Sequence, residues 1–414
     1  MKAIAKSALR GYPRADGRKG IRNVVVVAYL VECAHHVARH ITTRFGAQAV
    51  HLIGFPGCYP NAYAEKMMQQ LCTHPNVGAV LLVSLGCESM NKRWLEQVIA
   101  DSGRPVHTLT IQKSGGTKST IAAGAEWVQW ALSSLENAPT VAMGVHELVI
   151  GTTCGGSDGT SGLTGNPAVG RAFDALIAAG AACVFEETGE LIGCEPHMVQ
   201  RAVTPELGAE IMRSMEKAAR YYATLGYGSF AVGNSDGGLT TIEEKSLGAY
   251  AKSGASAICG LLKPGDVPPR DRGGLYLLDV VPDGEVRYGF PNINDNAELA
   301  ELMACGAHLI LFTTGRGSVV GSAISPVIKV CANPETYRAM TDDMDINAGR
   351  ILEGAATLDE VGQEIVALVV ALGNGAQSKS EELGHQEFIL TYKAFEPIGP
   401  ACLPLAAPVR VALA

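Results

Sequence analysis

Three cysteines occupy equivalent places in this 414-residue sequence. Cys58, Cys87 and Cys154 each follow a run of apolar residues, and each stands beside a glycine. Because the carboxyl ends of parallel strands meet at one edge of a sheet, we expect the three sulfurs to lie together. Three thiolates are a soft ligand set that suits iron, an iron–sulfur cluster or zinc. The alternative is that cysteine serves as a small core residue, and we prefer it for the cysteines inside apolar runs, namely Cys72, Cys183, Cys259 and Cys331.

An acidic run follows a strand-like segment at 182–185. Residues 186–197 read EETGELIGCEPH and include Glu187 and His197, which could act as a general base or a metal ligand. The alternative is a solvated loop that leads into a helix, with Glu190 or Glu195 near the positive end of the helix dipole. The sequence leaves both interpretations open.

A third group of residues surrounds an arginine between two glycines. Thr314 ends an apolar run, Arg316 follows in the segment TGRGS, and Lys329 lies in the next strand-like piece. An arginine in this setting can present its planar fork to a carboxylate or a phosphate. A buried lysine can be neutral, so Lys329 is a candidate base. The segment lacks the GK[ST] of a phosphate-binding loop, and no GxGxxG follows the first strand-like run, so nucleotide binding has little support.

Short apolar runs alternate with amphipathic stretches along most of the chain. This pattern predicts an α/β protein of two doubly wound, mainly parallel sheets, divided into residues 1–138 and 139–414. We interpret 260–274, which contains three prolines, as an exposed excursion or lid. The expected strands are 24–30, 49–53, 79–83, 106–111, 147–151, 182–185, 274–281 and 309–312. The expected helices are 34–45, 63–72, 92–100, 119–135, 167–179, 206–224, 242–252, 297–305 and 358–372.

Composition excludes several classes of protein. Apolar residues make up 47% and charged residues 18%, which excludes a disordered chain. The net charge of −8 and the lack of a basic run argue against nucleic-acid binding. The longest apolar runs, at 24–30 and 77–83, are far shorter than the roughly 20 residues that cross a bilayer, and the N-terminus has no secretory pattern. We therefore predict a cytoplasmic protein that binds neither membranes nor nucleic acid.

Several separated motifs resemble those of the altronate and galactarate dehydratase family. They occur in order over nearly the whole chain: GYPRADGRKGIRN at 11–23, LGCE at 85–88, CGGSDGTSGLTGNPAVG at 154–170, GGLTTIEEKSLG at 237–248, FTTGRGS at 312–318, PVIKV at 326–330 and DINAG at 345–349. The resemblance implies an iron-dependent hydro-lyase that removes water from a sugar acid and leaves a 2-keto-3-deoxy acid. The iron, as Fe²⁺ or as a cluster, would be held by Cys58, Cys87 and Cys154, and a mononuclear iron could be completed by Glu187.

The reaction that the resemblance implies gives roles to residues inside the motifs and in the acidic run at 186–197. Arg316 would clamp the substrate carboxylate, and Lys329, His197 or Glu187 would take part in catalysis. The other expected substrate-binding residues are Thr314, Ser157, Asp158 and Asn166.

Partners and alternatives follow from the same resemblance. Relatives often carry a small SAF-type domain, and only ten residues precede Gly11, so we expect a separate small subunit and a homo-oligomer. One alternative is the large subunit of a lyase that releases sulfite from sulfolactate. Two others are a metal-dependent sugar-acid sensor or scaffold, which is not an enzyme, and a zinc hydrolase.

Overall fold

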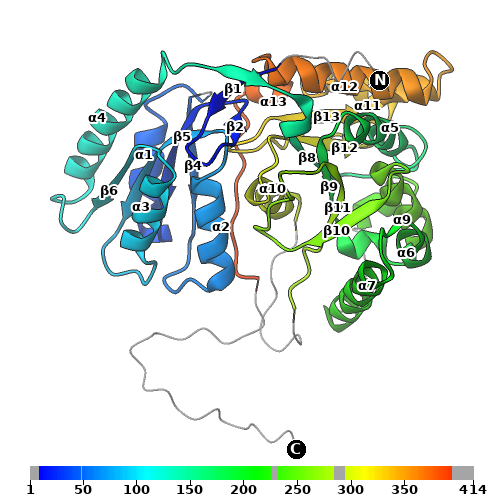
Figure 1. Cartoon of the computed structure of the whole chain (residues 1–414), viewed down its shortest axis with the longest axis horizontal. Helices are drawn as coiled ribbons and strands as arrows, with labels where there is room; N and C mark the ends of the chain where they lie inside the picture. Colours follow the sequence, from blue (N-terminus) through cyan, green and yellow to red (C-terminus); the bar gives the residue numbers. More distant parts are fainter. Residues whose placement is uncertain (1–8, 48, 226–231, 284–293, 394–414) are drawn as a thin grey trace, which may run out of the picture.

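The computed structural model describes residues 9–47, 49–225, 232–283 and 294–393. Its strands form three sheets, and the two larger ones lie side by side with helices packed around them (Figure 1).

The first large sheet has four parallel strands in the order β4-β3-β5-β6. It forms because its strands are short valine- and leucine-rich runs, and all eight residues of β5 are buried. Asn61 and Asn91 cap two of the helices, since their side chains accept hydrogen bonds from the backbone N–H groups of Ala64 and Trp94. The strands are β3 (Val24–Tyr29), β4 (Val50–Gly54), β5 (Val77–Ser84) and β6 (Val106–Thr110), and the helices are α1 (Glu32–Thr42), α2 (Ala62–Cys72), α3 (Lys92–Asp101) and α4 (Thr117–Leu135).

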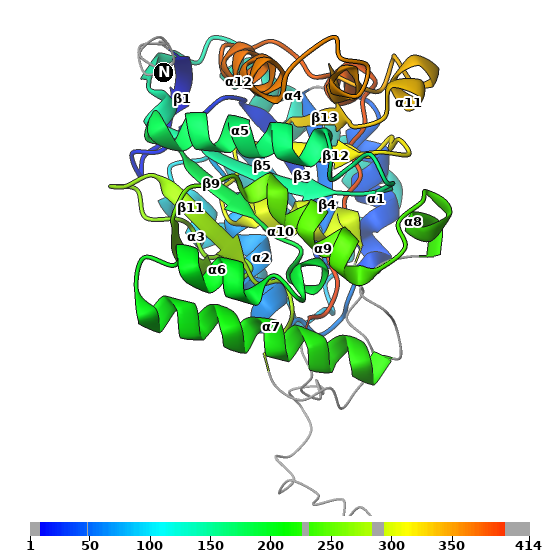
Figure 2. The ribbon, with the colours of Figure 1, turned by 90° about the vertical axis from the view of Figure 1, so that its right-hand side faces the viewer.

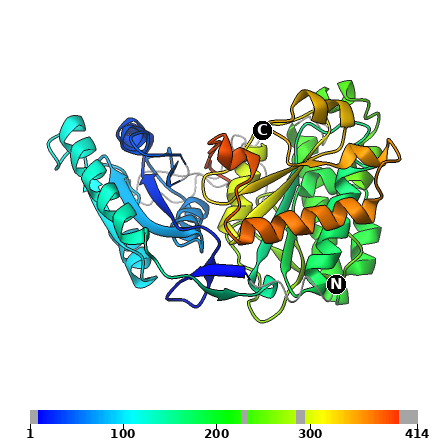
Figure 3. The same ribbon diagram turned by 90° about the horizontal axis from the view of Figure 1, so that it is seen from above.

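The second large sheet has seven parallel strands in the order β10-β11-β9-β8-β12-β13-β14. These strands are β8 (Val149–Cys154), β9 (Ala182–Phe185), β10 (Ile258–Leu262), β11 (Gly274–Leu278), β12 (Leu309–Thr314), β13 (Val327–Cys331) and β14 (Ile346–Asn347). Two separate apolar clusters cover its two faces, because alternate side chains of each strand point to opposite sides. Helices α5 (Gly165–Ala178) and α12 (Leu358–Gly373) pack on one face, and α10 (Asp295–Ala304) packs on the other (Figures 2 and 3).

The remaining helical segments are short or peripheral. The α-helices are α6 (Glu195–Arg201), α7 (Pro205–Leu225), α8 (Val232–Asp236), α9 (Ile242–Tyr250), α11 (Pro334–Ala339) and α13 (Lys379–Glu382). The 3-10 helices are η2 (Val145–Glu147), η3 (Thr188–Leu191), η4 (Ala251–Ser253) and η5 (Ala348–Ile351).

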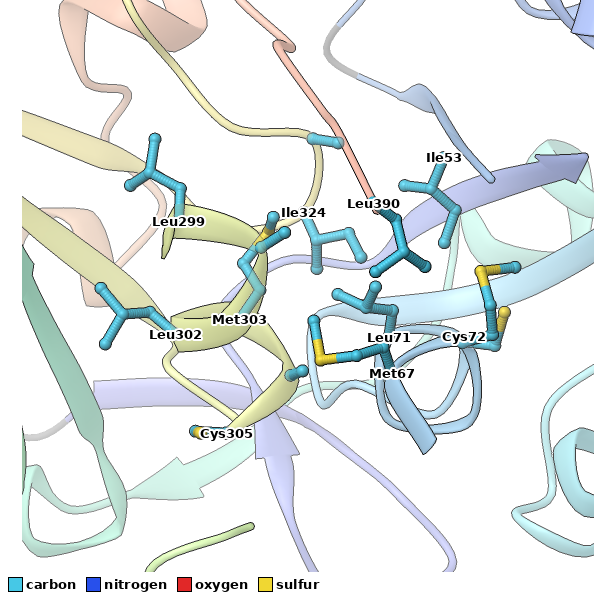
Figure 4. Packing of buried hydrophobic residues seen from close by; sticks show 14 of the residues in the cluster. Ile53, Met67, Leu71, Cys72, Leu299, Leu302, Met303, Cys305, Ile324 and Leu390 are labelled. Atoms are coloured by element: carbon cyan, nitrogen blue, oxygen red, sulfur yellow. The ribbon is translucent and has the colours of Figure 1, made fainter. Parts of the chain in front are cut away.

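A continuous apolar core joins the two large sheets. Met67 and Leu71 of α2 lie against α10, where Leu302 and Met303 are fully buried, and Leu390 of the C-terminal segment packs beside them (Figure 4). A polar contact lies in the same interface. The Tyr63 hydroxyl donates to Glu301 at 2.7 Å, and Glu301 forms a buried ion pair with Lys393 at 2.8 Å.

A small antiparallel sheet also links the two parts of the chain. It consists of β1 (Leu9–Pro13), β2 (Lys19–Gly20) and β7 (Val141–Met143), in the order β2-β1-β7. The sequence pattern did not indicate these strands, because each is short and carries little alternation of polar and apolar residues.

The predicted fold class is confirmed, because the structure is an α/β protein whose two large sheets consist of parallel strands. The excursion expected at 260–274 was predicted wrongly at both ends. Residues 260–262 belong to the edge strand β10, which pairs with β11, and Gly274 is the first residue of β11. The division of the chain near residue 138 stays a prediction. Within the described residues, no helix is both long enough and apolar enough to cross a membrane.

Candidate active site

The ends of two central strands place the main group of polar residues. Strand β8 comes first in the chain within its sheet, β9 adds on one side, and β12 adds on the other. The carboxyl end of β8 is therefore a topological switch point, which is where open parallel sheets bind ligands. Cys154 ends β8, and Glu186 and Glu187 directly follow β9.

Glu187 has an unusual backbone conformation. Its φ of +83° is the only positive φ of a non-glycine residue in the described segments. Such a conformation costs on the order of 1–3 kcal/mol and often marks functional sites. The side chain is buried, and its Oε1 accepts hydrogen bonds from the backbone N–H of Cys154 at 2.6 Å and from the Thr153 hydroxyl at 3.3 Å. The strained turn after β9 thus directs this carboxylate to the end of β8.

Two buried lysines approach the same place from α9 and η4. Lys245 lies 3.0 Å from the Ser157 hydroxyl and 3.2 Å from the Cys154 sulfur, and it forms an ion pair with Glu190. Lys252, seven residues later, forms an ion pair with Glu187. Both ammonium groups are almost fully shielded from solvent. Their partners therefore carry most of the electrostatic compensation.

Two overlapping groups of potential ligand atoms share Glu187. In each group the ligand atoms lie within 4.8 Å of one another. The first contains Cys154, Glu187 and Glu190, and the second contains Glu186, Glu187 and Glu298. Glu190 is half-buried, whereas Glu186 and Glu298 are buried. The first group is thus the one closer to solvent.

Burial and mutual repulsion shift the protonation of these carboxyl groups. Burial, together with Glu298 and Glu187, raises the pKa of Glu186, and burial with Glu187 and Asp295 raises that of Glu298. Burial also raises the pKa of Glu190. Burial would raise that of Glu187 as well, but Lys252 and Lys245 outweigh it and lower its pKa. The cluster therefore combines one carboxyl group that ionises more readily than a free glutamate with three that ionise less readily.

Burial and nearby negative charges also raise the pKa values of the Cys154 thiol and of Asp295. Burial and the neighbouring Glu187 raise the pKa of the Cys154 thiol. Burial, Glu187 and Glu190 raise the pKa of Asp295 to about 6. At neutral pH the thiol is therefore protonated, whereas Asp295 is mostly ionised but close to its own pKa.

The donor set fits a divalent cation. Both carboxylate oxygens of Glu186 are buried and make no hydrogen bond of standard geometry. Five carboxyl groups surround the two lysines, Lys245 and Lys252: those of Glu186, Glu187, Glu190, Asp295 and Glu298. When all five are ionised, three negative charges are left uncompensated by the lysines. A divalent ion would satisfy the Glu186 oxygens and most of this charge.

The three cysteines predicted as ligands lie in different surroundings. Cys154 is buried within the cluster, whereas Cys58 and Cys87 are exposed. The loops that follow β4 and β5 touch, since the Ser89 N–H donates to the Cys58 carbonyl at 2.9 Å. Among the described residues, neither exposed cysteine belongs to a three-ligand group of single-ion dimensions. The three-cysteine site, including its cluster form, stays a prediction.

Several predicted substrate-binding residues shape the glycine-rich loops. Asp158 accepts hydrogen bonds from the backbone N–H and hydroxyl of Thr160, and Asn166 accepts one from Thr313. The Thr314 hydroxyl accepts from the Gly317 N–H at 3.0 Å. These contacts hold the loops after β8 and β12.

Two other predicted substrate-binding residues differ in exposure. Ser157 is buried beside Lys245 and Cys154. Arg316 is exposed, and its guanidinium group donates to the Gly233 carbonyl. Ser157 therefore joins the cluster, while Arg316 remains accessible to a solvent-borne anion.

The two predicted bases other than Glu187 lie outside the cluster. Lys329 is fully buried on β13, its ammonium nitrogen is 3.4 Å from Nδ1 of His385, and burial lowers its pKa. His197 is exposed on α6, and its ring stacks on Tyr250 with a centroid separation of 6.1 Å. Their catalytic roles stay predictions.

The sequence interpretation missed four charged residues of the cluster. Lys245 and Lys252 are seven residues apart, which places them on one side of a helical path. Asp295 and Glu298 are three apart at the start of α10, whose remaining residues are mostly apolar. A charged residue at a helix position that is otherwise apolar indicates a buried charge, and this was the signal that could have identified these four residues.

Comparisons with known proteins agree with this picture. Residues 145–395 match the family described as D-galactarate/Altronate dehydratase, C-terminal, and residues 11–136 match D-galactarate dehydratase/Altronate hydrolase, second domain. The chain belongs to the D-galactarate/altronate dehydratase family. This confirms the family that the motifs indicated, and it confirms an enzyme of the carbon–oxygen lyase class.

Three characterised relatives match most of the chain. The (2R)-sulfolactate sulfo-lyase subunit beta of Chromohalobacter salexigens is 32% identical, over 92% of this chain and 96% of its own length. The altronate dehydratase of Escherichia coli is 29% identical, over 92% of this chain and 76% of its own length. The galactarate dehydratase (L-threo-forming) of Escherichia coli is 31% identical, over 88% and 72%.

Proposed function

We propose that the chain dehydrates a sugar acid, converting a 2,3-dihydroxy carboxylate into a 2-keto-3-deoxy acid. The observation that carries this proposal is the contact of Lys245 with Glu190, Cys154 and Ser157 at the end of β8, in a chain of a dehydratase family. The reaction removes a proton from C2 and hydroxide from C3, and the resulting enol becomes the ketone. It therefore needs a base, an acid and stabilisation of an enediolate.

Glu190 and Lys245 suit the two proton transfers. Glu190 is the more exposed partner, with 23% of its side chain accessible against 3% for Lys245. A carboxylate whose pKa is raised by burial is a stronger base, so ionised Glu190 would accept the C2 proton. Lys245 stays protonated because nearby Cys154, Glu190 and Glu187 outweigh the effect of burial and raise its pKa. Its ammonium group would give a proton to the departing hydroxyl.

Iron fits the deeper donor set. Glu186, Glu187 and Glu298 would hold it, and when bound it supplies positive charge and Lewis acidity beside the developing enediolate. Lys252 fixes Glu187, and the Cys154 N–H orients the same carboxylate. Coordination by Cys58, Cys87 and Cys154 is the competing arrangement.

Cleavage of a sulfonated hydroxy acid with release of sulfite is the second candidate. The chain covers 96% of a sulfo-lyase beta subunit but only 76% of an altronate dehydratase. The chemistry is related, because both reactions remove a proton from the carbon beside the carboxylate and expel a leaving group from the next carbon.

Parallel assays distinguish the two reactions. Protein purified anaerobically with iron would be offered aldonates, aldarates and sulfolactate, with detection of 2-keto acid and of sulfite. We expect keto-acid formation from a sugar acid without sulfite, and at least a roughly 100-fold lower kcat for Lys245→Met and Glu190→Gln. Lys66→Met is the matched control, since Lys66 forms a half-exposed ion pair with Asp266. Unchanged turnover in both site variants would contradict the proposed roles.

A small partner subunit belongs to the same proposal. One relative is named as a beta subunit, which implies association with another chain in that protein. We expect a small SAF-type protein to increase turnover of this chain in a saturable way, because binding depends on partner concentration. Activity that is full and unaffected by the added protein would contradict this expectation.

A further inference from the structure

A cavity lies at the opposite end of the seven-stranded sheet from Cys154. It has a volume of about 190 Å³, and Val149 and Ala182, the first residues of β8 and β9, line it. Strand β8 ends at Cys154, so the cavity and the cluster are separated by about 17 Å of strand at roughly 3.3 Å per residue. The cavity is therefore distinct from the proposed active site.

Most of the charged side chains that line this cavity are cationic. Arg18, Lys19, Arg270 and Arg272 contribute four positive charges, and Glu147 contributes one negative charge. Asp16, next to the cavity, pairs with Arg18 at 2.6 Å and approaches Arg270 at 3.9 Å. Asp16 and Glu147, which pair with Arg18 and Lys19, offset two of these four positive charges, so two remain among these six groups.

One arginine of the lining has no anionic partner among the described residues. Arg272 is exposed and forms no ion pair with any residue that the structure describes. Arg270 donates to the Asp16 carbonyl at 2.5 Å and has 58% of its side chain exposed. Two guanidinium groups on one loop are thus accessible at the cavity, and their planar forks match carboxylate and phosphate oxygens.

The size and walls of the cavity restrict its ligand. Since about 10–15 Å³ of cavity volume holds one water molecule, 190 Å³ is ample for a small anion. Pro75, Val267, Pro268 and Leu148 supply apolar walls, so the pocket combines apolar surface with a few charged groups, as small-molecule sites do.

The cavity also joins the two parts of the chain. Gly17–Lys19 and Pro75 come from segments that precede the seven-stranded sheet, whereas 267–273 and Gly306 belong to that sheet's connections. An anion held between Arg18 and the two loop arginines would therefore bridge both parts. We infer that this cavity is a binding site for a small carboxylate or phosphate anion, which stabilises the contact between the two parts of the enzyme.

Thermal unfolding of the full chain tests this site without using turnover. Sodium malonate and inorganic phosphate would be titrated separately, with sodium chloride added to keep ionic strength constant. We expect a saturable rise in the unfolding midpoint with at least one probe. Saturation by malonate alone would assign a carboxylate ligand, and saturation by phosphate would assign a phosphoryl ligand.

Paired substitutions locate the binding. The double variant Arg270→Gln and Arg272→Gln should need at least tenfold more probe for half-saturation. The double variant Arg213→Gln and Arg220→Gln, which changes two exposed arginines of α7, should match the parent. The single variant Arg272→Gln repeats the test if circular dichroism shows that the first double variant is unfolded.

Two results would overturn the inference. One is the absence of a saturable rise in the parent with either probe. The other is a parent-like response of the Arg270 and Arg272 variants, which would place the anion elsewhere, for example beside Cys154. Because the readout is stability, neither result depends on whether the chain dehydrates a sugar acid.

Discussion

Replacement of Lys252 by methionine is the most direct test of the electrostatic description of the cluster. The side chain keeps a similar length but loses its charge, and only 1% of it is exposed in the parent. Glu187, with 2% exposed, would then lack its ion-pair partner while facing Glu186 and Glu298. Removing one member of a buried pair costs about 3–5 kcal/mol, because the other charge remains buried.

This free energy translates into a large change in thermal stability. For a unit of 150–250 residues, 1 kcal/mol shifts the unfolding midpoint by about 2–4 °C, so Lys252→Met should lower it by roughly 6–20 °C. The control Lys66→Met disrupts an ion pair whose side chains are 40% and 43% exposed. Because such surface pairs contribute at most about 1 kcal/mol, its midpoint should fall by less than about 4 °C.

The pH dependence of Lys252→Met gives a second measure. Lys252 helps to keep the pKa of Glu187 low. Without it, burial raises the pKa of Glu187 above the unfolded value of about 4.3. The deficit relative to the parent should then be smallest below pH 4 and grow as pH rises through the folded pKa.

A double substitution separates charge from packing. Adding Glu187→Gln to Lys252→Met removes the unpaired charge and should recover more than half of the lost stability at pH 8. Scanning calorimetry and fluorescence-monitored unfolding measure all of these midpoints. A Lys252→Met midpoint equal to that of the Lys66 control, or no recovery in the double variant, would refute the reasoning.

Three further predictions concern other parts of the site. Cys154→Ala should lower both bound iron, measured by metal analysis, and turnover. Similar losses in the alanine variants of Cys58 and Cys87 would assign all three sulfurs to the iron site. Normal iron content in all three variants would reject every cysteine ligand. Arg316→Lys should raise KM for the acid substrate about tenfold with little change in thermal midpoint, because lysine keeps the charge but loses the bidentate fork; an unchanged KM would place Arg316 outside the substrate contact. Asp295→Asn should make the protein more stable than the parent at pH 8 and about as stable at pH 4. The pKa of Asp295 is raised to about 6 in the folded state, so its ionisation destabilises the fold as pH rises through that value. Thermal midpoints at the two pH values test this, and equal midpoints of variant and parent at pH 8 would contradict it.

The sequence determined the helices and strands, and the sheet edge at which the candidate site residues lie. The strand expected at 182–185 is β9 to the residue, and the helix expected at 358–372 is α12 with one residue added. These predictions succeeded because the short apolar run and the helical period each reflect burial of one local segment. Cys154 and Glu187 were also expected at the correct edge of the sheet, since the carboxyl ends of parallel strands meet there; Glu187 follows β9, whereas Cys154 is the last residue of β8 rather than a loop residue.

Only the tertiary structure decided which charged side chains face one another. Lys245 is 91 residues from Cys154, and Glu298 comes from a helix on another connection of the sheet, so no local pattern couples them. The left-handed turn at Glu187 is equally invisible in the sequence, because glutamate carries no preference for that conformation and neighbouring contacts impose it. Local periodicity records whether a segment is buried, whereas the protonation and pairing of a carboxylate depend on charges that the fold brings within a few ångströms.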